Sequence, residues 1–257
     1  MIDPTGLFDS SKYAKLAFDS RKKFQKAEPF PHMSFDNFLN NDLALELSQN
    51  FPDYNDDIAW VVRDTENIKK RYQEDDKKLP KIFRLMLREF NSKQFLLFLE
   101  TLTGIENLIP DPYFINGGVH MSKKGDYLGV HADFNWNHMI QANRRVNALI
   151  YLTESWQKEW NGALELFKPN EKNPAKTIYP EFNRLIVFQT SAKSLHGHPI
   201  PLNTPDGVYR RVLNLYYYSR HKDENYADDP HFTKYTRQSS DWALNIKSKY
   251  EKSAEQT

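Results

Sequence analysis

The most informative absence in this sequence of 257 residues is cysteine, which does not occur at all. Without thiols, neither a disulfide framework nor a thiolate metal site can form, so any metal has to be held by His, Asp or Glu. Charge of one sign is not in excess either, because the formal net charge is +1. Bulk electrostatics therefore gives no reason to expect a nucleic acid or a membrane surface as a partner.

Long apolar runs are also missing. No segment approaches the roughly 20 apolar residues that cross a bilayer as a helix. Residues 1–20 lack the basic start, the apolar middle and the small-residue cleavage site of a secretion signal. We therefore expect a cytoplasmic protein. With 39% hydrophobic and 27% charged residues, the composition is that of an ordinary globular protein, and the length fits a single domain over residues 1–257.

Residues 1–110 carry patterns typical of helices, and we expect them to form a mostly helical support region. The expected helices are residues 11–26, a short helix capped by Asn41, residues 82–90, and a helix between Ser92 and Gly104. Glycine at the end of the last one is the residue type that most often closes a helix.

Residues 111–220 differ, because β-branched and aromatic residues form short runs that turn residues separate. The expected strands include residues 146–152, 164–167, 185–188 and 212–218, with turns at Asn161-Gly162, Pro169-Asn170 and Asp206-Gly207. No helix of useful length interrupts these runs, so an antiparallel barrel or jelly roll fits better than a parallel sheet. The predicted fold class is mainly β with helical support (α+β), and residues 221–257 are expected to form a peripheral tail.

The segment from Gly125 to Asp133 contains the first candidate metal ligands. In a strand, residues i and i+2 point to the same face, so His131 and Asp133 would project together. A mononuclear non-haem iron centre uses two imidazoles and one carboxylate on one face, and it leaves the other positions open. The third ligand must come from another strand, and His196 and His198 are the two candidates for it.

A second His-x-Asp pair, formed by His221 and Asp223, lies in a charged stretch after the last expected strand. No strand partner there carries another histidine. We interpret this pair as a solvated surface feature, because charged residues in such stretches are mostly exposed.

Several further motifs follow His131-x-Asp133 in a fixed order. They are Tyr151-Leu152, the stretch from Trp160 through Gly162 to Leu166, His196-Gly197-His198-Pro199, and Arg210 before the Tyr-rich run that ends at Tyr218; Pro29–Leu39 precedes them all. Taken together, residues 112–220 resemble the prolyl 4-hydroxylase-like branch of the 2-oxoglutarate/Fe(II)-dependent dioxygenase superfamily. The resemblance implies a double-stranded β-helix barrel with the N-terminal helices packed on one of its sheets.

The resemblance assigns roles to individual residues. It implies that His131, Asp133 and His196 bind Fe(II) and form the catalytic centre, with His196 preferred to His198 because the family ligand directly precedes glycine. Arginine binds a carboxylate through two parallel hydrogen bonds, and the family arginine that anchors the distal carboxylate of 2-oxoglutarate falls on Arg210.

Other parts of the cosubstrate site are left open by the residues. Arg211 competes with Arg210, although strand alternation would point the two side chains in opposite directions. Tyr151 matches a tyrosine whose hydroxyl meets the same carboxylate, with a barrel-filling role as the alternative. A tyrosine common in the family about ten residues before the His-x-Asp pair is absent; Met121 lies near that place, and Tyr127 is the candidate to take over.

The implied reaction is hydroxylation of a C–H bond, with O2 as oxidant and decarboxylation of 2-oxoglutarate to succinate and CO2. Ascorbate is a candidate reductant. The resemblance suggests a prolyl or other residue of a protein or peptide as the substrate. A free amino acid or small metabolite is an alternative substrate, and a cupin-like metalloenzyme that does not use 2-oxoglutarate is an alternative class. Asn135, Trp136, Asn137 and His138 are candidates for the substrate entrance, and the oligomeric state is not encoded in any pattern.

Overall fold

The computed structural model describes residues 6–8, 11–55, 58–220 and 229–236. The helices are α1 (Ser11–Gln25), α2 (Asn41–Gln49), α3 (Lys81–Phe90) and α4 (Lys93–Thr103). The strands are β1 (His32–Phe35), β2 (Val61–Thr65), β3 (Ile68–Gln73), β4 (Ile109–Pro110), β5 (Gly118–Ser122), β6 (Tyr127–Ala132), β7 (Trp136–Asn137), β8 (Ala142–Tyr151), β9 (Leu164–Phe167), β10 (Lys176–Ile178), β11 (Leu185–Gln189), β12 (Leu195–His198), β13 (Arg210–Ser219) and β14 (Lys234–Tyr235).

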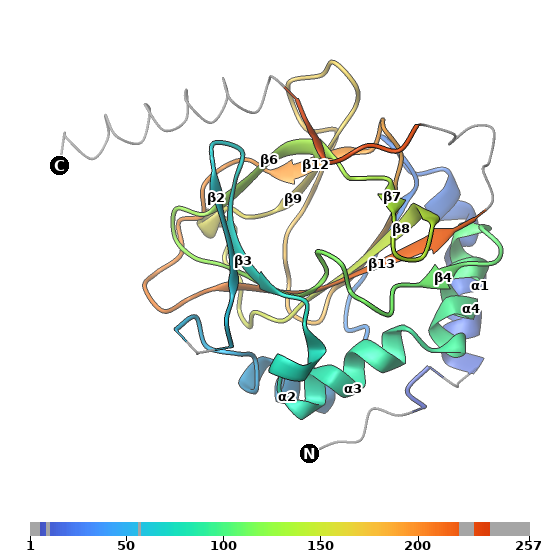
Figure 1. Ribbon diagram of the computed structural model, residues 1–257, viewed down its shortest axis with the longest axis horizontal. Helices are drawn as coiled ribbons and strands as arrows, with labels where there is room; N and C mark the ends of the chain where they lie inside the picture. Colours follow the sequence, from blue (N-terminus) through green and yellow to red (C-terminus); the bar gives the residue numbers. More distant parts are fainter. Residues whose placement is uncertain (1–5, 9–10, 56–57, 221–228, 237–257) are drawn as a thin grey trace.

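The strands form one antiparallel system in the order β1-β11-β8-β13-β5-β3-β6-β12-β9-β10. They curve into a nearly closed barrel, and the helices gather along one side of it (Figure 1). The β1-β11-β8-β13-β5 part and the β6-β12-β9-β10 part are joined through β3, which pairs with both β5 and β6. The predicted jelly-roll barrel is confirmed.

Alternation along β8 explains how the barrel acquires its two layers. Val146, Ala148 and Ile150 belong to the large cluster that also holds the buried side chains of the helices. Leu149 and Tyr151 belong to a smaller cluster inside the barrel. Because successive side chains of a strand point to opposite faces, one strand contributes both to the helix-covered core and to the barrel interior.

Capping residues set the ends of the helices. Ser92 caps α4 by accepting a hydrogen bond from the amide of Phe95, and Gly104 closes it in the left-handed conformation with φ 77°. The N-cap of α2 is Asn40, whose side chain accepts from the amide of Asp42 at 2.9 Å. The expected cap at Asn41 was therefore one residue late.

Two expectations need correction. The region before residue 110 is not helical throughout, because the β2–β3 hairpin lies in it and joins the barrel. The sequence hides this hairpin because β2 is largely exposed and a lysine, Lys70, stands in the middle of β3. Within the C-terminal tail, β14 is not peripheral, because it pairs with β6 beside His131. The pair His221 and Asp223 lies outside the described residues.

Among the described residues, no helix is both long enough and apolar enough to cross a membrane.

Candidate metal centre

His131 and His196 face each other across the pairing of β6 with β12. Their ring centroids lie 4.5 Å apart. The Nδ1 of His131 lies 2.8 Å from the carbonyl oxygen of Gly129, and that of His196 lies 2.9 Å from the carbonyl oxygen of Ser194. A carbonyl can only accept, so both Nδ1 atoms carry the proton, and both Nε2 atoms present a free lone pair.

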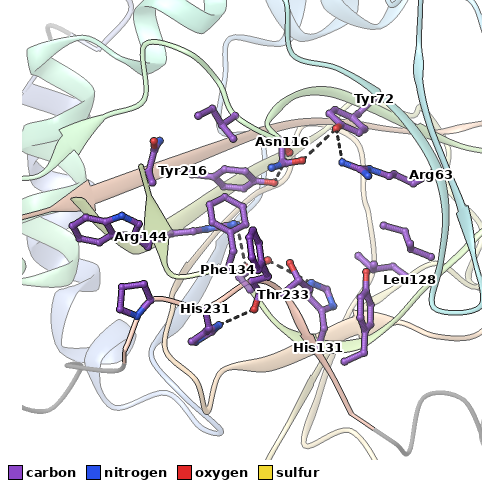
Figure 2. Close-up of a pocket in the computed structure, with 18 of the residues that line it drawn as sticks. Arg63, Tyr72, Asn116, Leu128, His131, Phe134, Arg144, Tyr216, His231 and Thr233 are labelled. Atoms are coloured by element: carbon purple, nitrogen blue, oxygen red, sulfur yellow. Dashed lines mark hydrogen bonds and ion pairs between the residues drawn. The ribbon is translucent and has the colours of Figure 1, made fainter. Parts of the chain in front are cut away.

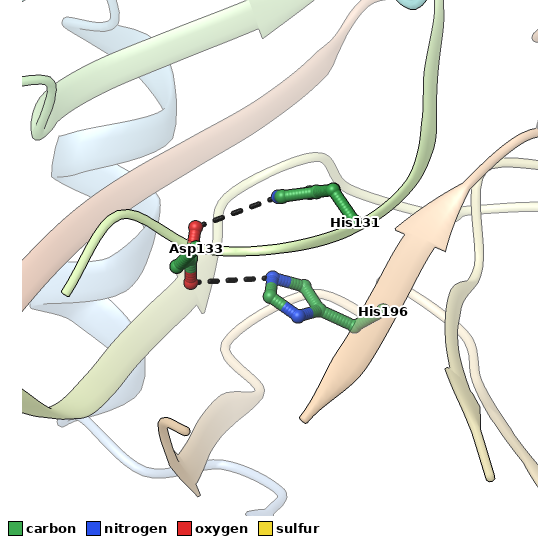
Figure 3. A group of neighbouring side chains, drawn as sticks. All are labelled: His131, Asp133 and His196. Carbon is green, nitrogen blue, oxygen red and sulfur yellow. Dashed lines mark ion pairs between the residues drawn. The ribbon is translucent and has the colours of Figure 1, made fainter. Parts of the chain in front are cut away.

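Asp133 lies directly after β6 and completes the group (Figure 3). Its Oδ1 is 3.4 Å from Nε2 of His131, and its Oδ2 is 3.4 Å from Nε2 of His196. One ligand atom from each of the three residues lies within 4.8 Å of the others. The structure thus brings together the three residues that the sequence suggested, and two imidazoles with one carboxylate are the donor set of non-haem Fe(II) centres.

A second layer of side chains fixes the carboxylate. The amide nitrogen Nδ2 of Asn147 donates to Oδ2 of Asp133 at 2.8 Å, and Nη2 of Arg144 lies 3.0 Å from the same oxygen. Two contacts in turn position Arg144. Its Nε donates to Oδ1 of Asn147 at 2.8 Å, and its guanidinium carbon Cζ lies 3.5 Å from the ring centroid of Tyr216. Since these donors all address Oδ2, Oδ1 is left available for a metal.

The electrostatics of the triad suit a metal. Burial by itself would raise the pKa of Asp133, but Arg144, His196 and His131 hold that pKa well below its usual range. Burial lowers the pKa of His196 to about 4, although Asp133 opposes this shift. At neutral pH the carboxylate is therefore ionised and His196 is neutral, and these are the protonation states that metal ligands require.

A β-bulge in β6 decides which neighbours face the centre. His196 pairs with His131, but His198 pairs with Leu128, so β6 has one extra residue between the two pairs. A bulge reverses the alternation, and Leu128 consequently lines the cavity with His131. Gly197 is needed opposite, because a Cβ there would come within 2.7 Å of the carbonyl oxygen of Leu128.

The same bulge removes Tyr127 from the site. Its hydroxyl donates to the carbonyl oxygens of Thr65 and Glu66 in the β2–β3 turn, at 3.2 and 3.1 Å. The prediction that Tyr127 contacts the cosubstrate therefore does not hold. Met121 is also absent from the site, because it is buried in the helix-side core.

Arg210 and Arg211 point in opposite directions, as alternation requires. Arg210 lines the same cavity as the triad, with Nε donating to the carbonyl of Gly162 at 2.8 Å and Nη2 donating to the hydroxyl of Tyr151 at 3.0 Å. Arg211 instead reaches the carbonyl of Ser48 at the end of α2. No carboxylate among the described residues pairs with Arg210, so its charge is free to receive an anion.

Gly162 belongs to the Trp160–Leu166 motif and has a steric reason to be glycine. Its φ is 71°, and a Cβ would lie 2.4 Å from Cδ2 of Leu202 and 3.2 Å from Cδ of Arg210. The backbone can therefore approach the arginine closely only here. Burial raises the pKa of Tyr151, with Arg210 opposing, so the hydroxyl under the guanidinium stays protonated.

Several cavity residues gave no signal in the sequence. They are Lys70, His120, Ser122, Arg144 and Asn147. Most are polar residues at inward positions of strands, where a strand pattern alone predicts an apolar side chain. His198 also lines the cavity, and its buried Nδ1 has no hydrogen-bond partner among the described residues.

A groove of about 690 Å³ borders His131 and Asp133 of the triad, and Figure 2 shows His131 among the side chains that line it. One wall is the β2–β3 hairpin, with Arg63, Lys70 and Tyr72. The other is formed by the residues after β6 and by residues 230–235. Of the four candidates for the entrance, Trp136, Asn137 and His138 line the groove.

The fourth candidate, Asn135, holds the second wall together. Its Nδ2 donates to the carbonyl of Asp229 at 3.0 Å, and its Oδ1 accepts from the amide of His231 at 2.7 Å. Beyond it, Phe232 is 92% exposed.

Comparisons with known proteins agree with this geometry. Residues 117–218 match the model of the 2OG-Fe(II) oxygenase superfamily. The chain is 28% identical over 180 residues to mouse prolyl 3-hydroxylase OGFOD1, a match that covers 66% of this chain and 29% of the mouse protein. The chain thus spans less than a third of the length of that relative.

Solved structures show the same fold. A prolyl hydroxylase from Trichoplax adhaerens, solved with a peptide fragment of the hypoxia inducible factor, superposes with a TM-score of 0.58 at 17% identity, covering 85% of this chain and 95% of that chain. A prolyl-4-hydroxylase from Pseudomonas putida gives 0.57 at 17% identity, covering 80% of this chain and all of the other. Residues 117–218 are therefore similar to the 2OG-Fe(II) oxygenase superfamily, and the chain has the same fold as these prolyl hydroxylases.

Proposed function

We propose that the protein is an Fe(II)- and 2-oxoglutarate-dependent dioxygenase that hydroxylates a residue of a protein or peptide, with a prolyl residue as the first candidate. The observation that carries the proposal is one cavity with two parts. At one side it holds the His131–Asp133–His196 triad, and at the other it holds Arg210, to which no described carboxylate is paired.

The residues present fit the groups that this reaction needs. His131, Asp133 and His196 would hold Fe(II) through two Nε2 lone pairs and the free Oδ1. Arg210 would bind the distal carboxylate of 2-oxoglutarate, with the Tyr151 hydroxyl beside it. With both bound, the centre supplies activation of O2, coupled to decarboxylation of 2-oxoglutarate to succinate and CO2, for hydroxylation of the substrate.

The groove supports a peptidyl substrate. Its volume of about 690 Å³ lies in the range of sites that enclose ligands much larger than one amino acid. Its walls come from separate segments of the chain, so an extended chain could enter between them. The mouse relative is named a prolyl 3-hydroxylase, and the Trichoplax enzyme was solved with a peptide. The superfamily match does not favour the cupin-like alternative.

The protein's chain contributes positioning and protection. Arg144 and Asn147 keep Oδ2 of Asp133 occupied and so orient Oδ1 toward Nε2 of His131. Phe188 and Leu164 line the inner cavity and limit its access to water. Residues 230–235 would close over a substrate from the side opposite the hairpin.

The test of reaction class is an anaerobic titration with Fe(II) and 2-oxoglutarate, followed through the visible charge-transfer band of a chelated 2-oxo acid. We expect a band in the wild type, no band in Asp133→Ala, and a band that needs far more 2-oxoglutarate in Arg210→Met. A wild type that binds iron without giving the band would contradict the use of 2-oxoglutarate.

The substrate class is tested separately with a library of proline-containing peptides and mass spectrometry. We expect the mass of one oxygen atom to be added in a reaction that depends on 2-oxoglutarate. Turnover of free proline or small metabolites, without turnover of any peptide, would assign the small-molecule alternative. The cytoplasmic location and the single-domain organisation stay predictions from the sequence.

A further inference from the structure

Lys70 is the second cation of the cavity that lacks an anionic partner. It lies in the middle of β3, and its inward neighbours Ile68 and Tyr72 line the groove with it. Its ammonium offers three donors. Among the described residues the only hydrogen-bond partner of Nζ is Nδ1 of His120, at 3.1 Å. No described carboxylate forms an ion pair with it.

His120 fixes the direction of this ammonium. The Nε2 of His120 lies 3.1 and 3.2 Å from the carbonyl oxygens of Asn116 and Gly117, so Nε2 carries the proton. Nδ1 is then an acceptor, and it receives the bond from Lys70. Burial and the nearby ammonium lower the pKa of His120 well below its usual value, so the imidazole stays neutral. The lysine is thus held by a neutral partner and keeps its charge for something else.

The place of Lys70 differs from that of Arg210. Lys70 borders both the groove and the inner cavity, together with His131 and Asp133. Arg210 borders the inner cavity but not the groove. Two cations without anionic partners, one at the metal side and one at the far side, match a ligand with a carboxylate at each end. 2-Oxoglutarate is such a ligand.

We propose that Lys70 binds the metal-end carboxylate of 2-oxoglutarate from the groove side, while Arg210 binds the distal carboxylate. The inference rests on the proposed function. It also gives the site a donor in place of the absent family tyrosine, because Met121, near that position, and Tyr127, the candidate to take over, both point away from the cavity. Burial, opposed by Asp133 and assisted by Arg210, lowers the pKa of Lys70 to about 8, so it is still mainly an ammonium at neutral pH.

The test is the anaerobic titration of the Fe(II)-loaded protein with 2-oxoglutarate. We expect Lys70→Met to raise the Kd about 10- to 100-fold, the usual effect of removing a hydrogen bond to a charged group. Lys70→Arg should recover part of the loss. Lys69→Met is the matched control, because Lys69 lies on the same strand, its side chain is 43% exposed, and it pairs with Asp64 at 3.8 Å. Thermal unfolding verifies that each variant is folded.

A second ligand tests which carboxylate of the cosubstrate Lys70 binds. 2-Oxopentanoate has the same length but lacks the distal carboxylate. We expect Lys70→Met to weaken the binding of 2-oxopentanoate and of 2-oxoglutarate by the same factor. Arg210→Met should weaken the binding of 2-oxoglutarate alone. His120→Leu should act through Lys70, so its effect on the Kd should not add to that of Lys70→Met.

Each contrary outcome is distinct. Unchanged Kd values for both ligands in Lys70→Met overturn the inference and leave the proposed function standing. A loss confined to 2-oxoglutarate moves Lys70 to the distal end and contradicts the assignment. A raised KM for peptide with an unchanged cosubstrate Kd makes Lys70 a substrate contact and also overturns it. No charge-transfer band in the wild type overturns the proposed function, and the inference with it.

Discussion

Replacing Asn147 by leucine should separate the stability of the barrel from the quality of the metal centre. Asn147 is neutral and 3% exposed, and it makes two hydrogen bonds of 2.8 Å, one to Oδ2 of Asp133 and one from Nε of Arg144. Leucine has a similar volume, so packing is largely conserved. Because the lost side chain carries no charge, the substitution does not alter the Coulomb repulsion that Arg144 exerts on a metal.

The magnitude follows from these two bonds. Loss of the bond to Arg144 leaves a buried donor unpaired, which costs roughly 1–3 kcal/mol of folding free energy. Loss of the bond to Asp133 frees the carboxylate to rotate, and outer partners of metal ligands typically change metal affinity about 10- to 100-fold. We therefore expect both a lower Tm and a weaker Kd for Fe(II), measured by anaerobic titration.

The matched control is Asn137→Leu. Asn137 is 1% exposed, and its Nδ2 donates to Oδ2 of Asp111 at 3.3 Å, a carboxylate that does not belong to the triad. This variant should lose stability and keep its affinity for Fe(II). If Asn147→Leu lost stability but bound Fe(II) as the wild type does, Asn147 would serve the fold only, and the proposed orientation of Asp133 would be wrong.

Three further predictions concern other parts of the molecule. Burial raises the pKa of Glu165 from 4.5 to about 7, so ionisation of Glu165 opposes folding as the pH rises through that window. In urea unfolding, Glu165→Gln should therefore stabilise the protein by on the order of 3 kcal/mol at pH 8 and by less than about 1 kcal/mol at pH 5. An equal gain at both pH values would refute the assignment. Gly197→Ala should lose at least about 1–3 kcal/mol through backbone overlap with Leu128, which a wild-type Tm would contradict. Asn135→Ala should raise the KM for peptide by loosening residues 230–235 while the 2-oxoglutarate Kd stays constant, and a change in that Kd would refute a role confined to substrate.

Strand alternation made part of the site predictable from the sequence. Arg210, Val212, Asn214 and Tyr216 line the cavity, whereas Arg211 contacts α2. A period of two puts the two arginines on opposite faces of the strand, but the preference for Arg210 came from the resemblance to the family rather than from alternation. The ligand set His131, Asp133 and His196 was likewise accessible, because its residues recur in an ordered series of motifs.

Other choices needed the partner strand. His196 and His198 both line the cavity, so alternation could not separate them. Their pairing partners distinguish the two histidines, because His196 is opposite His131 and His198 is opposite Leu128. The extra residue in β6 that produces this shift is invisible in the sequence of β6 alone, and it also explains why Tyr127 was misplaced.

The β2–β3 hairpin escaped prediction for the reason that makes it functional. A strand is recognised by apolar residues on its inward face, but β3 presents Lys70 there, between Ile68 and Tyr72. In addition, β2 has mostly exposed side chains. Its place is therefore set by backbone pairing with β5 and β6 rather than by burial of apolar area.

The charges of the cavity argue that metal and cosubstrate bind as a pair. Lys70, Arg144 and Arg210 face one described carboxylate, Asp133. Fe(II) alone would add positive charge to a site that already has an excess of it. Two carboxylates of 2-oxoglutarate would compensate both the metal and the two cations without anionic partners. Since coupling between two ligands is reciprocal, the dicarboxylate that offsets this charge should strengthen iron binding by the same factor by which iron strengthens binding of the dicarboxylate.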